Sequence, residues 1–527
     1  MTITAGAGQR QGAGAPTTAE PDPAPAVRHG GNIRAAARRG AACRTALGDG
    51  LPSSSPRAVR ILRRRYWETT PGRLRLARAV CLLLGTALVA LLAVTATGLS
   101  GTWDAIEQRD EPRTVAATQL NLALNDMDAQ AANILLSSGD SGTGKGRLDE
   151  SYTNANKLYK DAQETISRSL RTLGAASEGD RTTEDTVVSL TDDFARYQEL
   201  IGRSLENDEH PGGKDPARAD YRRATDLLAD RLLPQARTLV DANNTVYEGQ
   251  YEATHSDLTG QLVAEAVLGV LLLAALVVLQ VHLARRFGRV FNPALLAATL
   301  CALVALVCGG QLLTGSADQL TIARHDSFDS VVALSRSKAI AYDANADESR
   351  YLFDATRSAT YEHSYLDKSR QLYGLSGATL TTYDDQLVMT WAAYQHDHSD
   401  KEFTGEYRRE LDNITFPGER EAAEKTVDAY VVYQEDDRTF RRLIAEGKLQ
   451  EATVFCIGWA PDSSNAHFGA WMKALGRLTA INTKYGDEAK QAGRSALAVQ
   501  APVSGVALLL AGGLLVVGLR PRLAEFR

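Results

Sequence analysis

Cysteine is scarce in this chain, with five residues in 527. Cys81, Cys301 and Cys308 fall inside long apolar stretches and Cys43 in an arginine-rich N-terminal segment, so Cys456 is alone in the polar remainder. A disulfide needs two cysteines in one compartment, and metal-binding patterns need closely spaced pairs. The sequence therefore excludes a disulfide framework outside the apolar stretches, and it predicts neither a metal site nor a cofactor.

Motifs of enzyme chemistry are also lacking. The chain has no H-E-x-x-H pattern, no nucleophile elbow and no pair of carboxylates whose spacing implies catalysis. Gly139–Gly146 reads GDSGTGKG and approaches a phosphate-binding loop, but Gly146 stands where that motif needs a hydroxyl group for magnesium. No strand is expected before this segment, so we interpret it as a turn. We expect a protein that is not an enzyme.

The nine histidines are scattered, and the densest group is His396 and His398 beside Asp397 and Asp400. A metal site would need further ligands, and the sequence supplies none, so it favours a solvated polar loop here. Adjacent acidic residues are expected on exposed helix faces; they are Asp192 with Asp193, and Asp436 with Asp437.

Four long apolar stretches dominate the sequence: Ala79–Leu99, Gln261–Leu283, Asn292–Thr314 and Ala496–Leu519. A helix of about 20 residues spans the hydrocarbon core of a membrane, so we predict four transmembrane helices in a lipid bilayer. Glu265 is the one acidic residue within them, and we expect it at the membrane interface. The lack of ionisable groups at mid-membrane argues against a transporter.

Basic residues gather beside these stretches. Residues 1–78 hold 14 arginines, no lysine and four acidic residues, and the short segments 284–291 and 520–527 are basic as well. Segments 101–260 and 316–497 carry 29 acidic residues each, against 17 and 21 basic ones. Because basic segments stay in the cytoplasm, both termini are expected there, in the plasma membrane. The predicted organisation is a disordered cytoplasmic tail 1–78, membrane spans 79–99, 261–283, 292–314 and 496–519, a cytoplasmic loop 284–291, extracytoplasmic bundles 100–260 and 315–495, and a cytoplasmic tail 520–527.

The N-terminal segment is rich in Ala, Gly, Pro and Arg and has few large apolar residues, which is typical of disorder. Val59 to Arg78 mixes arginines with Ile, Leu, Tyr and Trp. Such a segment either binds anionic lipid headgroups or only fixes the topology. No nucleic-acid partner is expected.

Both acidic segments have the periodicity of amphipathic helices. In the first, apolar residues such as Leu120, Leu124 and Met127 recur at spacings of three and four. Glycine-rich breaks divide it, and long helices joined by short loops favour an up-down-up-down four-helix bundle. The helices are expected near 102–138, 148–174, 181–208 and 217–260.

The second acidic segment repeats the first. Equal spacing relates three pairs of motifs, at offsets of 217, 236 and 238 residues, and the growth between the first two offsets predicts an insertion within Gly374–Pro417. The fold class is therefore an all-α membrane protein with two four-helix bundles that arose by internal duplication. The pairs are Asp126-x-Asp128-Ala129 with Asp343-x-Asn345-Ala346, Phe194-x-x-Tyr197-Gln198-Glu199 with Tyr430-x-x-Tyr433-Gln434-Glu435, and Ala242-x-Asn244-Thr245-x-Tyr247 with Ala480-x-Asn482-Thr483-x-Tyr485.

Residues in these repeats are the candidates for packing or signalling. The Ala-x-Asn-Thr-x-Tyr motif precedes the second and fourth apolar stretches, and Asn and Thr are mediocre helix formers. Its recurrence favours contacts with a neighbouring helix, either structural or as a signalling joint. The two aspartates would need a partner if buried. The candidates are Asp126, Asp343, Asn244, Thr245, Tyr247, Asn482, Thr483 and Tyr485.

Each half resembles the four-helix-bundle sensor modules of bacterial chemoreceptors and sensor kinases. The whole layout, with two span–bundle–span halves, an arginine-rich tail and no cytoplasmic output domain, resembles the GlnX-type membrane signalling proteins of actinobacteria, over residues 79–519. That resemblance implies a relay of amino-acid status from an extracytoplasmic solute-binding lipoprotein to a cytoplasmic serine/threonine protein kinase.

The expected function is therefore a transmembrane signal-relay sensor whose bundles pair within the chain. The alternative is a membrane scaffold, or an accessory subunit of a transporter or cell-envelope complex.

Overall fold

A computed structural model describes residues 70–138, 148–177, 180–287 and 292–525. It divides into two compact parts, Met1–Arg75 and Leu76–Arg527. Only a few residues of the first part are described, and they begin helix α3. Everything below concerns the second part, in which we call 76–287 the first half and 292–525 the second half.

The described residues form helices and no strand longer than an isolated bridge. The predicted all-α class is confirmed. In the first half the helices are α3 (Thr70–Ala105), η2 (Ile106–Asp110), α4 (Glu111–Ser137), α5 (Asp149–Ala176), α6 (Arg181–Glu209), α7 (Lys214–Leu227), η3 (Leu228–Leu232) and α8 (Leu233–Phe287).

The second half follows the same order with additions. Its helices are α9 (Pro293–Thr321), η4 (Ile322–Phe328), α10 (Asp329–Phe353), η5 (Ala355–Arg357), α11 (Ser358–Leu372), α12 (Tyr383–His396), α13 (Glu406–Asp412), α14 (Glu419–Ala445), α15 (Leu449–Ile457) and α16 (Ser464–Ala524). Helices α12 and α13 lie within the predicted insertion.

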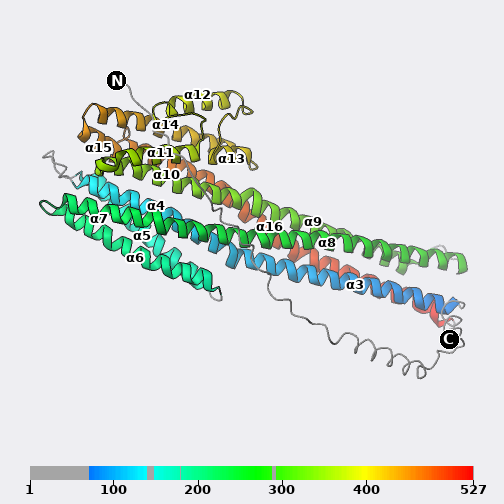
Figure 1. Ribbon diagram of the computed structural model, residues 1–527. Coiled ribbons are helices and arrows are strands. Elements are labelled where there is room, and N and C mark those ends of the chain that lie inside the picture. The colour runs from blue at the N-terminus through cyan, green and yellow to red at the C-terminus, as the bar shows by residue number, and fades with distance from the viewer. Residues whose placement is uncertain (1–69, 139–147, 178–179, 288–291, 526–527) are drawn as a thin grey trace, which may run out of the picture. The chain divides into compact units, whose positions relative to one another are not determined.

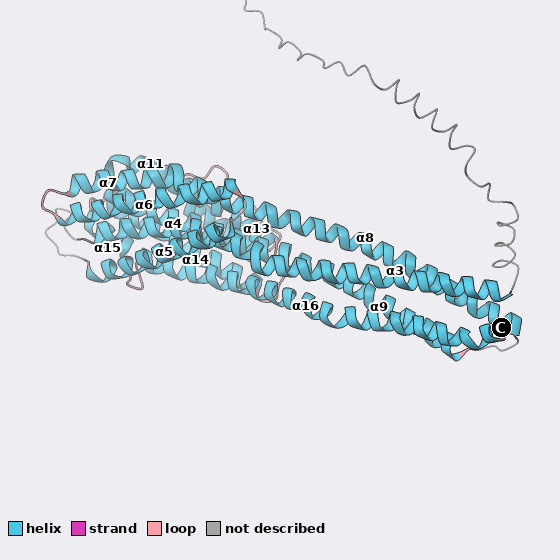
Figure 2. Cartoon of the chain, turned by 90° about the horizontal axis from the view of Figure 1, so that it is seen from below, coloured by secondary structure: helices cyan, strands magenta, loops and turns pink. Residues whose placement is uncertain are grey.

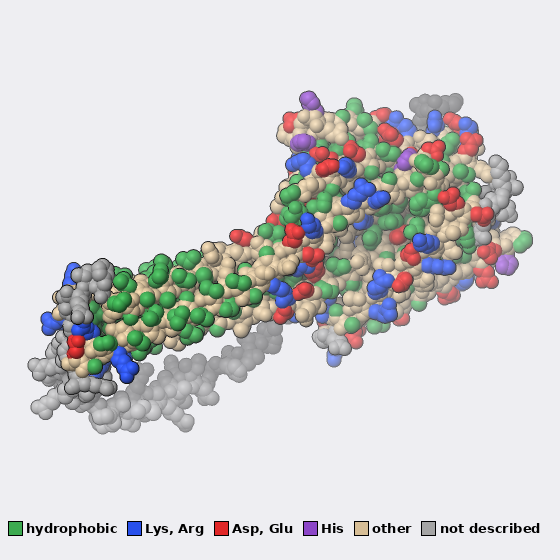
Figure 3. All heavy atoms as spheres, turned by 180° about the vertical axis from the view of Figure 1, so that it is seen from behind, with side chains coloured by type: hydrophobic (Ala, Val, Ile, Leu, Met, Phe, Trp, Pro, Cys, Tyr) green, Lys and Arg blue, Asp and Glu red, His purple; other side chains and the backbone are tan. Residues whose placement is uncertain are grey.

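Among the described residues, four helices are long and apolar enough to cross a membrane, which is the number predicted. Each runs on into a polar bundle; the continuous helical stretches are Gly72–Ser137, Lys214–Arg286, Pro293–Phe353 and Ser464–Ala524. Figures 1 and 2 show α3, α8, α9 and α16 alongside one another at the apolar end. On the face seen in Figure 3, hydrophobic side chains cover that end and charged side chains cover the bundles.

The two halves are built on different cores. The core of the first half is aliphatic, with Leu120, Leu124 and Ile166 fully buried, and residues of the second half such as Phe328 complete it. The second half also has its own cluster, in which tyrosine and tryptophan predominate.

The insertion supplies part of this aromatic core. Tyr383 of α12 shares a hydroxyl hydrogen bond of 2.8 Å with Tyr430 of α14, and Tyr407 of α13 accepts one of 2.8 Å from the indole of Trp471 on α16. The insertion therefore packs against the bundle as a part of it.

Candidate functional site

A buried cation of the bundles, Arg350 on α10, joins the two halves. Its guanidinium lies 2.5 Å from Asp128 of α4 and 2.6 Å from Asp347 on its own helix, and its side chain is 8% exposed. A buried charge is costly unless ion pairs and hydrogen bonds satisfy it. Arg350 therefore holds the first helix of one bundle against the first helix of the other.

Asp128 is fully buried, and its hydrogen bonds are supplied from both halves. Tyr197 of α6 donates its hydroxyl over 2.8 Å, Tyr221 of α7 donates over 3.3 Å, and Arg350 supplies two further N–H groups. Charge-assisted bonds of this kind are roughly twice as strong as neutral ones. The carboxylate is thus held by three other helices at once.

The candidate Asp343 belongs to the same network. Lys368 of α11 lies 2.8 Å from it and Arg350 3.1 Å. Burial alone would raise the pKa of Asp343, but the two cations outweigh burial and lower that pKa to about 2. Asp343 therefore stays ionised and has the partner that a buried aspartate requires.

The equivalent candidate in the first half, Asp126, has no ion-pair partner among the residues that the structure describes. Gln130 donates to it over 2.9 Å, and burial raises its pKa to about 7 despite that bond. Asp126 and Asp343 match in sequence but differ in charge near neutral pH, because only Asp343 has cations beside it that keep its carboxylate ionised.

Further contacts between the halves follow α10 toward its C-terminal end. Ser349 donates to Asn133 of α4 over 2.7 Å, and Arg222 of α7 forms an ion pair with Asp354. We call the whole set, together with Arg350 and Asp128, the interlock. It couples the first helix of the second bundle to two helices of the first bundle.

A second joint lies where the bundles meet the apolar segments. A π-helical segment interrupts the α-helix there in both halves, η2 at Ile106–Asp110 and η4 at Ile322–Phe328. Moving η2 by the 217 residues that relate the repeats places it on 323–327, inside η4. Such segments often mark functional sites, and their coincidence supports the duplication.

Arg324 of η4 is 2% exposed and is held by the fourth helix of the first half. It lies 2.7 Å from Glu248, donates to the side-chain oxygen of Asn244 over 3.1 Å, and lies over the ring of Tyr247 at 5.0 Å. Two of the candidates from the repeated motif, Asn244 and Tyr247, therefore face this joint. Thr245 points to solvent and donates only to Asp241 of its own helix.

The second copy of the motif is placed differently. The backbone carbonyl of Asn482 accepts from Ser327 of η4 over 2.7 Å, and its own side chain is fully buried. Tyr485 stacks on Phe416, with ring centroids 4.4 Å apart, whereas Thr483 donates to its own helix. The structure thus brings Asn244, Tyr247 and Asn482 to η4. Neither threonine of the motif contacts η4 through its hydroxyl group.

The α16 helix also packs against the first half at this level. Lys490 lies 2.5 Å from Glu111 of α4, and a Cβ at Gly493 would lie 2.3 Å from the ring of Trp103 on α3. Only glycine allows that approach, so the fourth helix of the second half is fixed against the first helix of the first.

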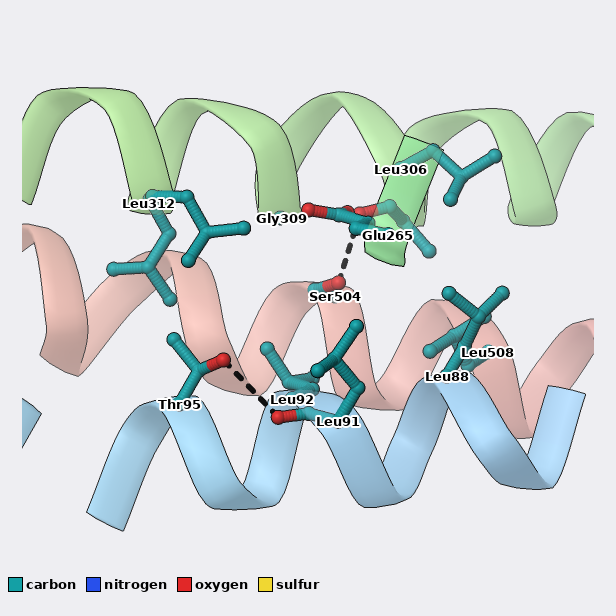
Figure 4. A pocket seen from close by; sticks show the side chains of 12 residues that line it. Leu88, Leu91, Leu92, Thr95, Glu265, Leu306, Gly309, Leu312, Ser504 and Leu508 are labelled. Carbon is teal, nitrogen blue, oxygen red and sulfur yellow. Dashed lines mark hydrogen bonds between the residues drawn. The ribbon is translucent and has the colours of Figure 1, made fainter. Parts of the chain in front are cut away.

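Glu265 is buried inside the four apolar helices, where the residue is 9% exposed (Figure 4). It faces Gly309, where an added Cβ would lie 2.1 Å from its Oε1 atom, and Ser504 lines the same small pocket. The carboxyl group fits there because the neighbouring helix carries a glycine.

The expectation that the paired acidic residues are exposed is wrong for three of the four. Asp193 is buried beside Arg231, Asp436 beside His467, and Asp437 beside Arg441. Only Asp192 is exposed. Sequence periodicity did not predict the burial of these three aspartates, because their partners come from distant helices or from one turn further along the same helix.

The remaining motifs contribute no site among the described residues. His398 lies 3.1 Å from Glu424, and no group of three metal-ligating side chains occurs in the described ranges. Gly139–Gly146 lies outside the described residues. Arg350 and Arg324, two buried cations that join the halves, were not among the predicted candidates. The spacing of Asp343, Asp347 and Arg350 on one helical face is the signal that could have revealed the first.

The fold and its joints define a multi-pass membrane protein in which two helical halves are locked together by buried ion pairs. Residues 102–252 match the family model of the actinobacterial sensor domain. The match covers most of the first half and less than a third of the chain. The comparison with curated proteins and that with solved structures give no match. The sensor-domain match supports a sensing or signalling role.

Proposed function

We propose that this protein is a transmembrane signal relay of the kind that the GlnX-type membrane proteins represent. Its bundles lie outside the cell and receive amino-acid status through a solute-binding lipoprotein. Both termini lie in the cytoplasm, where a serine/threonine kinase takes up the signal. The sensor-domain match and the basic flanks of the apolar segments support this proposal.

One observation carries the proposal: each half runs as continuous helix from the interlock into the apolar segments. Arg350 and the third apolar stretch lie on the single helical stretch Pro293–Phe353. A shift or rotation of this helix at the interlock is therefore passed along its whole length. One-turn slides and small rotations of packed helices are a common way of switching.

The π-helical joints suit this role. Each of η2 and η4 is a π-helical segment, and such segments within α-helices frequently lie at functional sites. Arg324 lies in η4 and contacts α8 of the other half, so a change in one bundle alters the entry of both halves into the membrane. The relay thus needs no catalytic residue.

Affinity capture from native membranes tests the proposal. The tagged protein is expected to retain a solute-binding lipoprotein and a serine/threonine kinase after cross-linking, and its deletion is expected to abolish the response of kinase phosphorylation to amino-acid supply. Arg324→Met should keep the lipoprotein but weaken the response. Association with a permease or an envelope synthase, without any response to amino acids, would favour a scaffold instead.

A further inference from the structure

A cavity of about 470 Å³ lies between the two halves, on the bundle side of the π-helical joints. Helix α4 and one residue of α8 form one side, and η4, α10 and α16 form the other. This is within the size range of sites for small organic molecules, roughly 300–1,000 Å³. Its lining includes Val115, Leu122, Tyr247, Phe328, Val332 and Lys338.

Lys338 is the unusual member of this lining. It reaches across to α16, where an added Cβ on Gly476 would lie 3.8 Å from its Nζ atom. Burial lowers the pKa of Lys338, and no neighbouring charge opposes that shift. Within the described ranges, no carboxylate forms an ion pair with this ammonium group, which makes it a largely buried cation that still lacks a counter-ion.

The other cation of the cavity is already neutralised. Lys490 lies 2.5 Å from Glu111 and 2.8 Å from Asp487. At one end of the cavity, near the π-helical joints, the charges are therefore paired with one another. The other end carries the positive charge of Lys338. A single unpaired ammonium group suits a monoanion, whereas a phosphate dianion would need more donors and would be repelled by the two acids.

The remaining polar groups offer few donors. Ser335 donates its hydroxyl to Val331 O, Thr479 to Leu475 O, and Thr483 to Thr479 O, each within its own helix. Thr118 and Ser327 likewise donate to backbone carbonyls, whereas the Gln119 amide is a further donor of the lining, and the rest of the surface is formed mainly by valine, leucine, tyrosine and phenylalanine side chains. The preferred occupant therefore has an apolar body and one anionic head.

The level of the cavity indicates a ligand from water rather than from the bilayer. Glu111 follows Leu99, the end of the first apolar stretch, by about 12 residues, or roughly 18 Å of helix. Lys338 follows Thr314 by about 24 residues, or roughly 36 Å. The positive end thus lies well beyond the reach of an acyl chain that stays in the membrane.

We propose that this cavity binds a small water-soluble organic monocarboxylate, with the carboxylate on Lys338 and the apolar body between α4, α10 and α16. This inference rests on the proposed sensing function and adds a direct ligand to it. Because the walls come from both halves, occupancy would favour one spacing of α4 and α10 and so bias the interlock.

Ligand binding to the full-length protein in phosphatidylcholine nanodiscs tests the inference. The probes are 3-phenylpropanoate, 3-phenylpropanol and 3-phenylpropylamine, which share a skeleton and differ in the head group. Titration calorimetry and the shift in Tm are the readouts. The carboxylate is expected to bind at least about tenfold more tightly than the alcohol or the amine, since a charge-assisted bond to a desolvated ammonium group contributes more than a neutral one.

Three variants separate binding from folding. Lys338→Met is expected to raise the Tm of the free protein, because it removes an unpaired buried charge, and to lower carboxylate affinity by about tenfold or more. Lys338→Arg keeps the cation and should retain binding within about threefold. Lys484→Gln, at an exposed lysine on the wall helix α16, is the control and should change nothing.

Equal binding of the alcohol and the carboxylate, or full affinity in Lys338→Met, would overturn the inference, as would the lack of any 3-phenylpropanoate binding at millimolar concentration. These outcomes leave the relay itself testable. Failure of the ligand site alone would leave the capture of lipoprotein and kinase intact. Failure of the relay would abolish that capture even if the carboxylate binds.

Discussion

The two halves share one plan and differ in how they satisfy their buried charge. In each, a tyrosine of the third helix donates to an acid of the first, Tyr197 to Asp128 and Tyr433 to Glu348. Asp128 is also paired with Arg350, while the other oxygen of Glu348 has no hydrogen-bond partner among the described residues. Burial raises the pKa of Glu348 well above its usual range. The acid of the first half is thus bound by a cation of the other half, whereas burial disfavours the charged form of the acid in the second half.

This difference shows how two halves with one plan can stay coupled while their cores differ. The aromatic insertion gives the second bundle a core of its own, whereas the first bundle is completed by residues of the second. The sensor-domain model matches only the first half. One half can therefore differ from the other in its core while a few buried ion pairs join the two.

Removing the cation of the interlock should have the largest effect. Arg350→Met leaves Asp128 and Asp347 without their shared cation, and breaking a buried pair costs about 3–5 kcal/mol. We expect a large fall in the free energy of unfolding, measured by denaturant titration in detergent. Arg336→Met on the same helix removes an exposed arginine and is expected to cost less than about 1 kcal/mol. Equal effects would argue against the interlock.

The matched aspartates should give opposite responses to pH. Asp126 has a folded-state pKa of about 7, above its usual 3.8, so its contribution to stability falls as pH rises from about 4 to 7. Asp126→Asn should remove that fall, which we expect to be on the order of 2 kcal/mol because one pKa unit is about 1.4 kcal/mol and the side chain keeps some access to solvent.

Asp343 has a folded-state pKa of about 2, below its usual 3.8, so its stabilisation is present above pH 4 and is lost only as pH falls toward 2. Asp343→Asn should therefore destabilise the protein equally at pH 4.5 and pH 8. The measurement is the free energy of unfolding of both variants and of the parent protein at these two pH values. A pH dependence unchanged by Asp126→Asn would contradict the assignment.

Glycines in the third apolar helix give a smaller and more local effect. Gly309→Ala would drive a methyl group into Glu265, and overpacking of this kind costs about 1–3 kcal/mol. At the adjacent Gly310 a Cβ meets nothing within 4 Å, so Gly310→Ala should change stability by less than about 0.5 kcal/mol. Thermal unfolding in nanodiscs measures the stability of the two variants side by side. A larger effect of Gly310→Ala would show that Glu265 does not occupy this position.

The smallest difference in stability is expected between the variants Tyr197→Phe and Tyr433→Phe. Tyr197→Phe leaves Asp128 with Tyr221 and Arg350, whereas Tyr433→Phe removes the hydroxyl that satisfies Glu348. An unsatisfied buried polar group costs about 1–3 kcal/mol. We therefore expect Tyr433→Phe to be the more destabilising by about 1 kcal/mol. The reverse order would mean that Asp128, not Glu348, depends on a single hydroxyl.

Sequence reasoning recovered what depends on local pattern. Charge-free stretches and three- and four-residue spacing predicted the helices, and α12 and α13 lie within the segment where the motif offsets predict an insertion. The partners of buried charges could not be predicted in the same way. Arg350 meets Asp128 because α10 packs on α4, a contact across 222 residues that no local pattern encodes. The burial of Glu265 against Gly309 could not be predicted either, because a sequence does not reveal which residues of two helices face each other.

The central claim is that a change at the interlock is carried along continuous helices to the far side of the apolar segments. Spin labels at Ala79 of α3 and Arg520 of α16, both exposed, would report the spacing of those far ends in a background with the five cysteines replaced. We expect Arg350→Met to change the distance distribution between the labels in nanodiscs, while Arg336→Met leaves it as in the parent protein. An unchanged distribution in Arg350→Met, in a protein that remains folded, would contradict the relay.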